Sequence, residues 1–375
     1  MFDFIPVYSY ESYFHYGVLI LVLLILWQCR VGSVLKKDVS SINSAWGFII
    51  CVILILYIGL RPIHQAFGDT INYYNSYLRL AESKEPFHFS FRGEWLFYDG
   101  LSWFAKNGFD LRYFFLICAA LYVGPLWVAC VRLFKNYNYI PFVIFLCMFT
   151  FWAYGVNGVR NGVAASLFIL ALTYVDRLPI AIIICIMASF FHKSVYLMIG
   201  AAGIAWFIKN SYLYLGGWIL SVIISYLAGN RIQTWLSNLS FFQEDDRFTG
   251  YLTGDNMRGE IVQWAMVFRW DFLIYSALGV AVGYYFIFRR NYKDEYYHWI
   301  YNIYIATNAF WVIIIRAAYS NRFAQISWFI LPLVLIYPFM KKRFWDNHEK
   351  MLGYAIIIFY AFAFYTNIYR QGLLF

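Results

Sequence analysis

Val18-Leu-Ile-Leu-Val-Leu-Leu-Ile-Leu-Trp27 is an unbroken hydrophobic run, and similar runs recur along the 375-residue chain. They approach the ~20 residues that a helix needs to cross a bilayer, and they lack the alternation of transmembrane β-barrel strands. Hydrophobic residues make up 62% of the chain and charged residues 13%, about half the charged share of an ordinary soluble domain. The sequence therefore predicts an all-α, polytopic membrane protein and excludes a soluble one.

About twelve transmembrane helices are predicted, with ten and eleven as alternative counts. The stretches cover residues 14–29, 44–60, 111–134, 138–155, 159–176, 178–192, 194–209, 212–229, 263–288, 297–317, 322–340 and 350–367. Two long polar segments, 61–110 and 230–262, lie between them and are predicted to contain short amphipathic helices. Because no repeat or linker divides the chain, residues 1–375 are predicted to form a single membrane domain.

Lys and Arg occupy alternate connections between these stretches, which sets the predicted orientation. Six connections carry them, at residues 30–37, 132–135, 177, 209, 289–293 and 341–350. By the positive-inside rule they face the cytoplasm, so both termini and both long polar loops are placed outside. The outer side holds twelve Arg and three Lys, against six Arg and eight Lys inside. Since Arg presents a planar fork suited to phosphate, we expect an anion to be handled outside.

Composition also excludes other partners and cofactors. The net charge is +9, but the chain has no soluble module with a basic face, which argues against nucleic-acid binding. The six cysteines lie in or beside hydrophobic stretches and form no Cys-x-x-Cys pair, so neither disulfide bonds nor a zinc site are predicted. We predict no metal and no cofactor.

The first outer loop, 61–110, contains two candidate segments. After Gly68, residues Asp69 and Tyr73 are four apart and share one face of a helix, and Asp69 could also be the N-cap of a helix over 70–80. Farther on, residues 94–104 read as an amphipathic helix on the membrane surface, with Glu94 and Trp95 at its start.

Polar residues also mark the ends of later hydrophobic stretches. Arg160 stands at the start of a helix, where free N–H groups and the positive dipole end suit a phosphate. His192 lies at an outer boundary and could exchange a proton near neutral pH. The pair Arg269 and Asp271 lies within the stretch 263–288. We expect the two to neutralise each other through neighbouring helices rather than directly, because side chains at i and i+2 point apart on a helix.

Two further sets of residues lie outside. Arg316, Tyr319 and Arg322 form a tight outer turn, in which two close arginines suggest a multiply charged anion. The second outer loop contains Arg258, close to Asp255 and Glu260.

In this order, the motifs resemble those of the EpsG/Wzy-type family of bacterial polysaccharide polymerases. The resemblance lies in Gly68-Asp69 followed by Tyr73, Val159-Arg160-Asn161-Gly162-Val163-Ala164, Phe191-His192-Lys193-Ser194 and Asn321-Arg322-Phe323. This chain departs from the family at Asn161, where Gln is common, and at Lys193, where a small residue or Pro is common. The resemblance covers most of the chain.

The resemblance implies a reaction at the outer face of the bacterial cytoplasmic (inner) membrane, facing the periplasm or the cell exterior. A growing glycan would pass from polyprenyl pyrophosphate to the non-reducing end of an incoming lipid-linked repeat unit. The partners implied are polyprenyl-pyrophosphate-linked oligosaccharides and the bilayer, with a chain-length regulator and a flippase as possible protein partners.

The chemical requirements of this reaction then assign roles to the residues singled out above. Preorganised arginines would stabilise the departing pyrophosphate, and a base would accept the proton of the acceptor hydroxyl. The expected pyrophosphate ligands are Arg160, Arg258, Arg316 and Arg322, the base candidates in order are His192, Asp69 and Glu94, and the aromatic residues expected to stack on sugars are Tyr73, Trp95 and Tyr319.

Three other functional classes stay open. A polyprenyl-phosphate-sugar glycosyltransferase would use acidic residues and a metal in its first outer loop, where Asp69 lacks an adjacent acid. An O-acyltransferase would receive its acyl donor from inside, whereas the strongest cluster here lies outside. A lipid-linked glycan flippase should carry charges deep within several helices, and Arg269 and Asp271 are nearly the only ones.

Overall fold

The computed structural model describes residues 4–237, 267–317, 319–370 and 372, and the regular secondary structure in these ranges is helical. Seven of the helices described there are long and apolar enough to cross a membrane. They are Val7–Val31, Lys37–Gly59, Leu111–Tyr137, Ser211–Gly229, Trp270–Arg289, Ser320–Lys341 and His348–Tyr369, and shorter apolar helices cover Val159–Leu172, Leu178–Phe191 and Val195–Phe207. The predicted all-α, polytopic membrane architecture is confirmed.

The chain divides into two compact units, and the first consists of Met1–Tyr196 with Phe339–Phe375. Its helices are α1 (Tyr10–Val31), α2 (Lys37–Gly59), α3 (Thr70–Glu82), α4 (Trp95–Lys106), α5 (Leu111–Phe134), α6 (Tyr139–Leu146), α7 (Phe151–Val156), α8 (Val159–Leu172), α9 (Leu178–Phe191) and α19 (His348–Phe364). Short helical turns also lie at Val7–Ser9, Gln65–Phe67, Lys135–Tyr137 and Tyr365–Tyr369. Helix α5 packs against α2 and α8, and α1 packs against α19.

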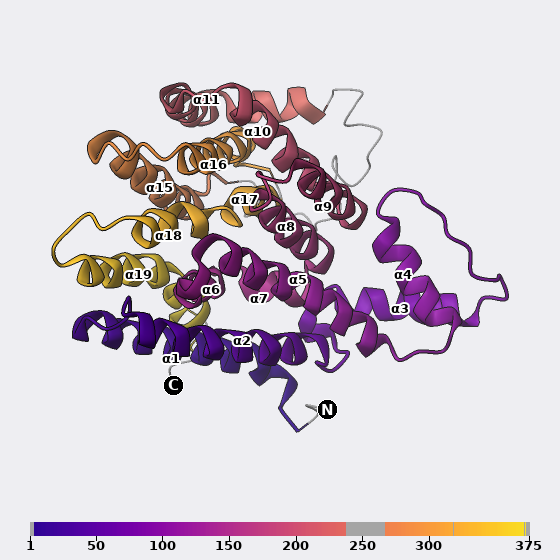
Figure 1. Ribbon diagram of the computed structural model, residues 1–375. Coiled ribbons are helices and arrows are strands. Elements are labelled where there is room, and N and C mark those ends of the chain that lie inside the picture. The colour runs from indigo at the N-terminus through magenta and orange to yellow at the C-terminus, as the bar shows by residue number, and fades with distance from the viewer. Residues whose placement is uncertain (1–3, 238–266, 318, 371, 373–375) are drawn as a thin grey trace. The chain divides into compact units, whose positions relative to one another are not determined.

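The first outer loop folds into α3 and α4, which lie beyond the ends of α2 and α5 (Figure 1). This confirms the helices predicted over 70–80 and 94–104. Helix α4 contacts α3, α5 and α9, and the buried side chains of Phe97, Leu101 and Ala105 supply its inner face. The loop is thereby joined to the bundle of the same unit.

The predicted span 138–155 is interrupted, because α6 ends at Leu146 and α7 begins at Phe151. In a membrane protein, carbonyl groups freed by such a break need other donors. Asn367 donates its side-chain N–H to the carbonyl of Phe149 at 2.8 Å, and the Tyr122 hydroxyl donates to that of Phe151 at 2.9 Å. The first bond satisfies a carbonyl within the break, and the second holds the start of α7 against α5.

The second unit is Leu197–Pro338. It contains α11 (Ser211–Ser237), α15 (Trp270–Tyr284), α16 (Glu295–Ile313) and α17 (Ser320–Trp328), most of α10 (Val195–Phe207) and α18 (Leu331–Lys341), and a turn at Tyr285–Arg289. Helix α16 packs against α11, α15 and α17. The predicted span 322–340 is split between α17 and α18, because Pro332 lacks an N–H and clashes with the preceding turn.

The expectation for Arg269 and Asp271 is wrong. They form a direct two-point ion pair, with Arg269 Nε 2.9 Å from Asp271 Oδ1 and Nη2 2.7 Å from Oδ2. Arg269 is the N-cap of α15 and has a non-helical backbone, so the rule that i and i+2 point apart on a helix does not apply. The two side chains are 30% and 45% exposed, which places the pair at a helix end rather than deep in a span.

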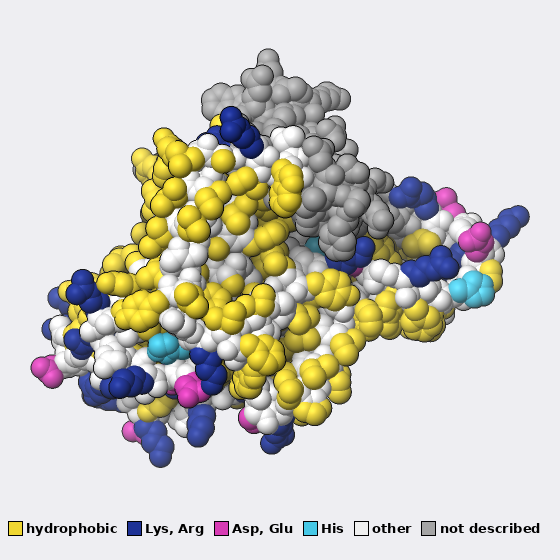
Figure 2. Space-filling view, turned by 90° about the horizontal axis from the view of Figure 1, so that it is seen from above, with side chains coloured by type: hydrophobic (Ala, Val, Ile, Leu, Met, Phe, Trp, Pro, Cys, Tyr) yellow, Lys and Arg dark blue, Asp and Glu magenta, His cyan; other side chains and the backbone are white. Residues whose placement is uncertain are grey.

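Hydrophobic side chains cover broad areas of the visible surface (Figure 2). On α1, for example, Ile20, Leu23 and Trp27 are each more than half exposed. Such apolar exposure would be costly in water and is expected of helices that face lipid.

Candidate functional site

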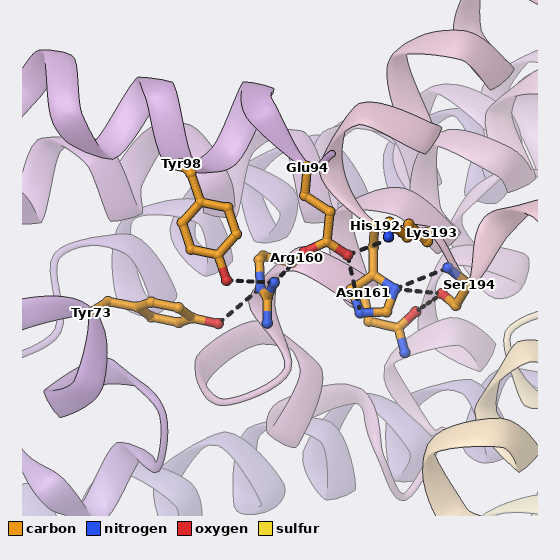
Figure 3. A network of polar contacts seen from close by, with 8 residues as sticks. All are labelled: Tyr73, Glu94, Tyr98, Arg160, Asn161, His192, Lys193 and Ser194. Carbon is orange, nitrogen blue, oxygen red and sulfur yellow. Dashed lines mark hydrogen bonds and ion pairs between the residues drawn. The ribbon is translucent and has the colours of Figure 1, made fainter. Parts of the chain in front are cut away.

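Three helix ends meet in the first unit and bring together side chains from distant parts of the sequence. Glu94 directly precedes α4, Arg160 is the second residue of α8, and His192 directly follows α9. Helix α9 packs against both α4 and α8, so the three side chains converge (Figure 3). Two charged residues and a histidine thus share one small polar site.

Arg160 and Glu94 form the central ion pair of this site. Arg160 donates Nη1–H to Glu94 Oε2 and, at 2.8 Å, to the Tyr98 hydroxyl, and its Nε–H to the Tyr73 hydroxyl at 3.2 Å. The side chains of Arg160 and Glu94 are only 14% and 8% exposed. Nη2 has no hydrogen-bond partner among the residues that the structure describes, so two further N–H groups can bind a ligand.

The charge of the site favours an anion. Arg160 lies in the first turn of α8, where the helix dipole adds positive potential to that of the guanidinium. Lys193 supplies a second cation beside His192, and its backbone N–H donates to Glu94 Oε1 at 3.3 Å. The helix dipole and the two N–H groups on Nη2 of Arg160 therefore favour a ligand with negative charge.

Tyr73 adds a neutral hydroxyl to this group. Burial raises its pKa to about 12, although the Arg160 charge acts in the opposite direction. The phenol therefore keeps its proton near neutral pH, so its oxygen accepts from Arg160 while its O–H can donate to an anionic oxygen.

His192 is held by contacts at both ring nitrogens. Its Nδ1 accepts the backbone N–H of Ser194 at 3.1 Å and lies 2.8 Å from Ser194 Oγ, which contacts Asn161 Oδ1 at 2.9 Å. On the other side, Nε2 lies 3.7 Å from Glu94 Oε1. The histidine thus connects the carboxylate to the first turn of α8, which carries both Arg160 and Asn161 (Figure 3).

Asp69 has different partners from the other two predicted bases. It stands at the N-cap position of α3, but its side chain makes no capping hydrogen bond, so the predicted capping role is wrong. Its carboxylate instead accepts from the Asn72 amide at 3.3 Å, and its backbone N–H donates to Asn157 Oδ1 at 2.9 Å. Asp69 remains one helical turn from Tyr73.

Gly68 permits that contact with Asn157. Its φ of +59° and ψ of −120° belong to a region that side chains avoid, and a Cβ there would collide with the Asn157 side chain. Asn157 lies in the connection between α7 and α8. The Gly68-Asp69 turn is therefore attached to the segment that directs Arg160.

Arg61 is a structural residue that the sequence analysis did not single out. Its side chain donates to the carbonyls of Ile58 and Val156 at 2.6 and 3.1 Å and to Thr70 Oγ1 at 2.8 Å. It is 1% exposed, and its guanidinium carbon lies 4.7 Å from the centre of the Phe115 ring. Burial lowers its pKa to about 10, which still leaves it charged. The available signal was a lone cation directly after the apolar run of α2.

Trp95 lies among aromatic residues next to Glu94. Its ring centre is 5.1 Å from that of Phe91 and 5.2 Å from that of Phe190, and the side chain is half-buried. These packing contacts anchor the start of α4. The stacking of Trp95 on a sugar stays a prediction.

The remaining predicted ligands belong to other parts of the chain. Arg316, Tyr319 and Arg322 lie in the second unit, where the Arg322 guanidinium carbon is 5.1 Å from the centre of the Tyr319 ring and that of Arg316 is 5.4 Å from the centre of the Phe268 ring. Arg258 and most of the second outer loop, 230–262, lie outside the described residues. Within the described residues, no group of three His, Cys, Asp or Glu side chains is placed to hold a metal ion.

Comparison with known proteins adds one match. A family model described as the EpsG family matches residues 44–374. This range includes Asp69, Glu94, Arg160 and His192. No curated protein and no solved structure matches the chain.

Proposed function

Because the chain belongs to the EpsG family, and is thus a polysaccharide polymerase in general terms, we propose a specific reaction for it. The protein transfers a growing glycan from polyprenyl pyrophosphate to the non-reducing end of an incoming polyprenyl-pyrophosphate-linked repeat unit. The reaction takes place at the outer face of the bacterial cytoplasmic membrane, on the side to which the positive-inside rule assigns the loop 61–110.

The observation that carries this proposal is the guanidinium of Arg160, whose Nη2 has no partner among the described residues. As the anomeric C–O bond breaks, its electron pair moves onto the departing pyrophosphate. Nη2, the Tyr73 hydroxyl and the free N–H groups of the first turn of α8 can donate to the oxygens that gain this charge. Donors held in place before the reaction lower the barrier without reorganisation.

A base stands beside these donors. The acceptor hydroxyl attacks the anomeric carbon and loses its proton, for which the adjacent Glu94 and His192 are the candidates supported by the geometry. A pyrophosphate bound at Nη2 shares the charge of Arg160 with Glu94 and so frees the carboxylate for this task. The predicted roles of Asp69, Arg258, Arg316, Arg322, Trp95 and Tyr319 stay predictions.

We test the proposal with purified protein and one lipid-linked oligosaccharide repeat from the native host, and follow products as a ladder on a gel. Arg160→Ala and Arg160→Lys should lower the initial rate by at least ~100-fold, because Lys keeps the charge but loses the planar fork. Arg79 is an exposed arginine on α3, and Arg79→Ala serves as the matched control with the wild-type rate.

Two results would overturn the proposal. A wild-type protein that yields no ladder but moves the lipid-linked unit across liposomes is a transporter. If Arg160→Ala produces the ladder at the wild-type rate, Arg160 does not stabilise the pyrophosphate.

A further inference from the structure

The backbone N–H of Ser194 constrains the proton on the ring of His192. An N–H group can only donate, and this one points at Nδ1 from 3.1 Å. Nδ1 is therefore an acceptor without a proton, and the neutral ring carries its proton on Nε2. A proton added to Nδ1 would face this N–H and be repelled.

The protonated Nε2 faces Glu94. It lies 3.7 Å from Oε1, longer than a hydrogen bond, so the N–H dipole orients and attracts the carboxylate from a short distance. Catalytic hydrogen bonds that are long without substrate often tighten when it binds. In this form neither ring nitrogen has a lone pair available to take a proton from a sugar hydroxyl.

We propose, on the basis of the function proposed above, that Glu94 is the catalytic base and that His192 and Ser194 are positioning residues. Ser194 holds the ring in the Nε2–H form through its backbone N–H, and His192 then donates to Glu94. The Ser194 hydroxyl donates its single proton to Asn161 Oδ1 at 2.9 Å, which connects Ser194 to the α8 turn of Arg160.

The proton and the electrons balance without any other reactant. The acceptor oxygen forms the new bond to the anomeric carbon, and the bond from that carbon to the pyrophosphate oxygen breaks with its electron pair. The hydroxyl proton passes to a Glu94 oxygen and later to water. His192 keeps its own proton throughout.

The variant His192→Gln distinguishes whether His192 acts as a hydrogen-bond donor or as a base. The Gln amide can place an N–H where Nε2 of the histidine lies, but it cannot accept a proton at neutral pH. We expect His192→Gln to retain a rate within ~10-fold of wild type in the ladder assay, and His192→Ala and Glu94→Gln to lose at least ~100-fold. His88→Gln and Glu85→Gln, both at exposed positions of the first outer loop, are the matched controls.

A His192→Gln protein that is folded and as inactive as His192→Ala would overturn the assignment, as would a Glu94→Gln protein of wild-type activity. For Ser194, we expect Ser194→Ala to slow the reaction and Ser194→Thr, which keeps the hydroxyl, to restore it. Equal rates for both Ser194 variants and the wild type would remove the hydroxyl from the proposal.

A second measurement needs no substrate. Nitrogen-15 NMR of histidine-labelled protein in lipid nanodiscs, with His192→Gln to identify the His192 signals, reads which ring nitrogen carries the proton. We expect a protonated Nε2 and an unprotonated Nδ1 at neutral pH. A protonated Nδ1 would overturn this inference but not the proposed polymerase function. If the wild-type protein makes no polymer in the ladder assay, both the proposed reaction and the assignment of the base are wrong.

Discussion

Arg61 shows what a single buried cation does in this fold. Its donors reach Ile58 at the end of α2, Thr70 at the start of α3 and Val156 at the end of α7. These neutral partners, together with the face of Phe115, replace the carboxylate that a buried cation usually requires. The residue therefore joins three segments next to the site without taking part in its charge balance.

Replacement of Arg61 by Ala should destabilise the first unit. Hydrogen bonds to a charged group contribute about 1.5–3 kcal/mol each, and the loss leaves a cavity and unpaired carbonyls, so we expect a loss of ~3 kcal/mol or more. Thermal unfolding in detergent should show a clearly lower midpoint for Arg61→Ala and an unchanged one for the exposed Arg79→Ala. Equal midpoints for the two variants would contradict this role.

At the scale of elements, the site depends on helix ends rather than helix faces. Glu94, Arg160 and His192 lie at or next to the ends of α4, α8 and α9, where backbone groups lack partners within the helix. The turn at Gly68 controls one of these ends, because Asn157 accepts the N–H of Asp69 just before α8 begins.

Gly68→Ala should therefore lower the stability of the protein more than Gly108→Ala does. Gly68 and Gly108 both have positive φ, but only at Gly68 would a Cβ collide with a neighbour. Backbone strain alone should cost Gly108→Ala ~1 kcal/mol, whereas Gly68→Ala should lose more stability and also slow polymerisation, because Asn157 is displaced. Unfolding midpoints and ladder rates for the two variants test this, and matching values would refute it.

At the scale of the whole molecule, the distribution of Lys and Arg predicts the orientation of the site. Helix α2 is apolar and long enough to cross the membrane, and the charged connection at 30–37 precedes it. The candidate site follows it along the chain. A cytoplasmic connection at 30–37 therefore puts the first outer loop on the opposite side.

Cysteine labelling tests this orientation. Lys36→Cys and Lys84→Cys introduce cysteines at exposed positions before α2 and after α3, while five of the six native cysteines are buried and Cys185 is partly buried. A membrane-impermeant maleimide should label Lys84→Cys in intact cells and Lys36→Cys only after permeabilisation, with the unsubstituted protein as background. The reverse pattern would place the site in the cytoplasm.

The fold class and the limits of most helices could be predicted from the sequence, because lipid offers no hydrogen bonds and forces each apolar stretch to satisfy its own backbone. That constraint is local. Breaks such as the one between α6 and α7 were not predictable, since the donor to a carbonyl within it comes from the distant Asn367. The helix rule failed at Arg269 for a different reason, because Arg269 is the N-cap of α15 and has a non-helical backbone.

Which polar residues meet was decided by the tertiary structure alone. The sequence marked Glu94, Arg160 and His192 as candidates one by one. Glu94 and Arg160 are 66 residues apart and meet because α4 and α8 both pack against α5 and α9. Asp69 ranked between His192 and Glu94 as a candidate base in the sequence, and in the structure its carboxylate accepts a hydrogen bond from Asn72. Short polar motifs show which side chains can do chemistry, whereas packing of distant helices determines which of them act together.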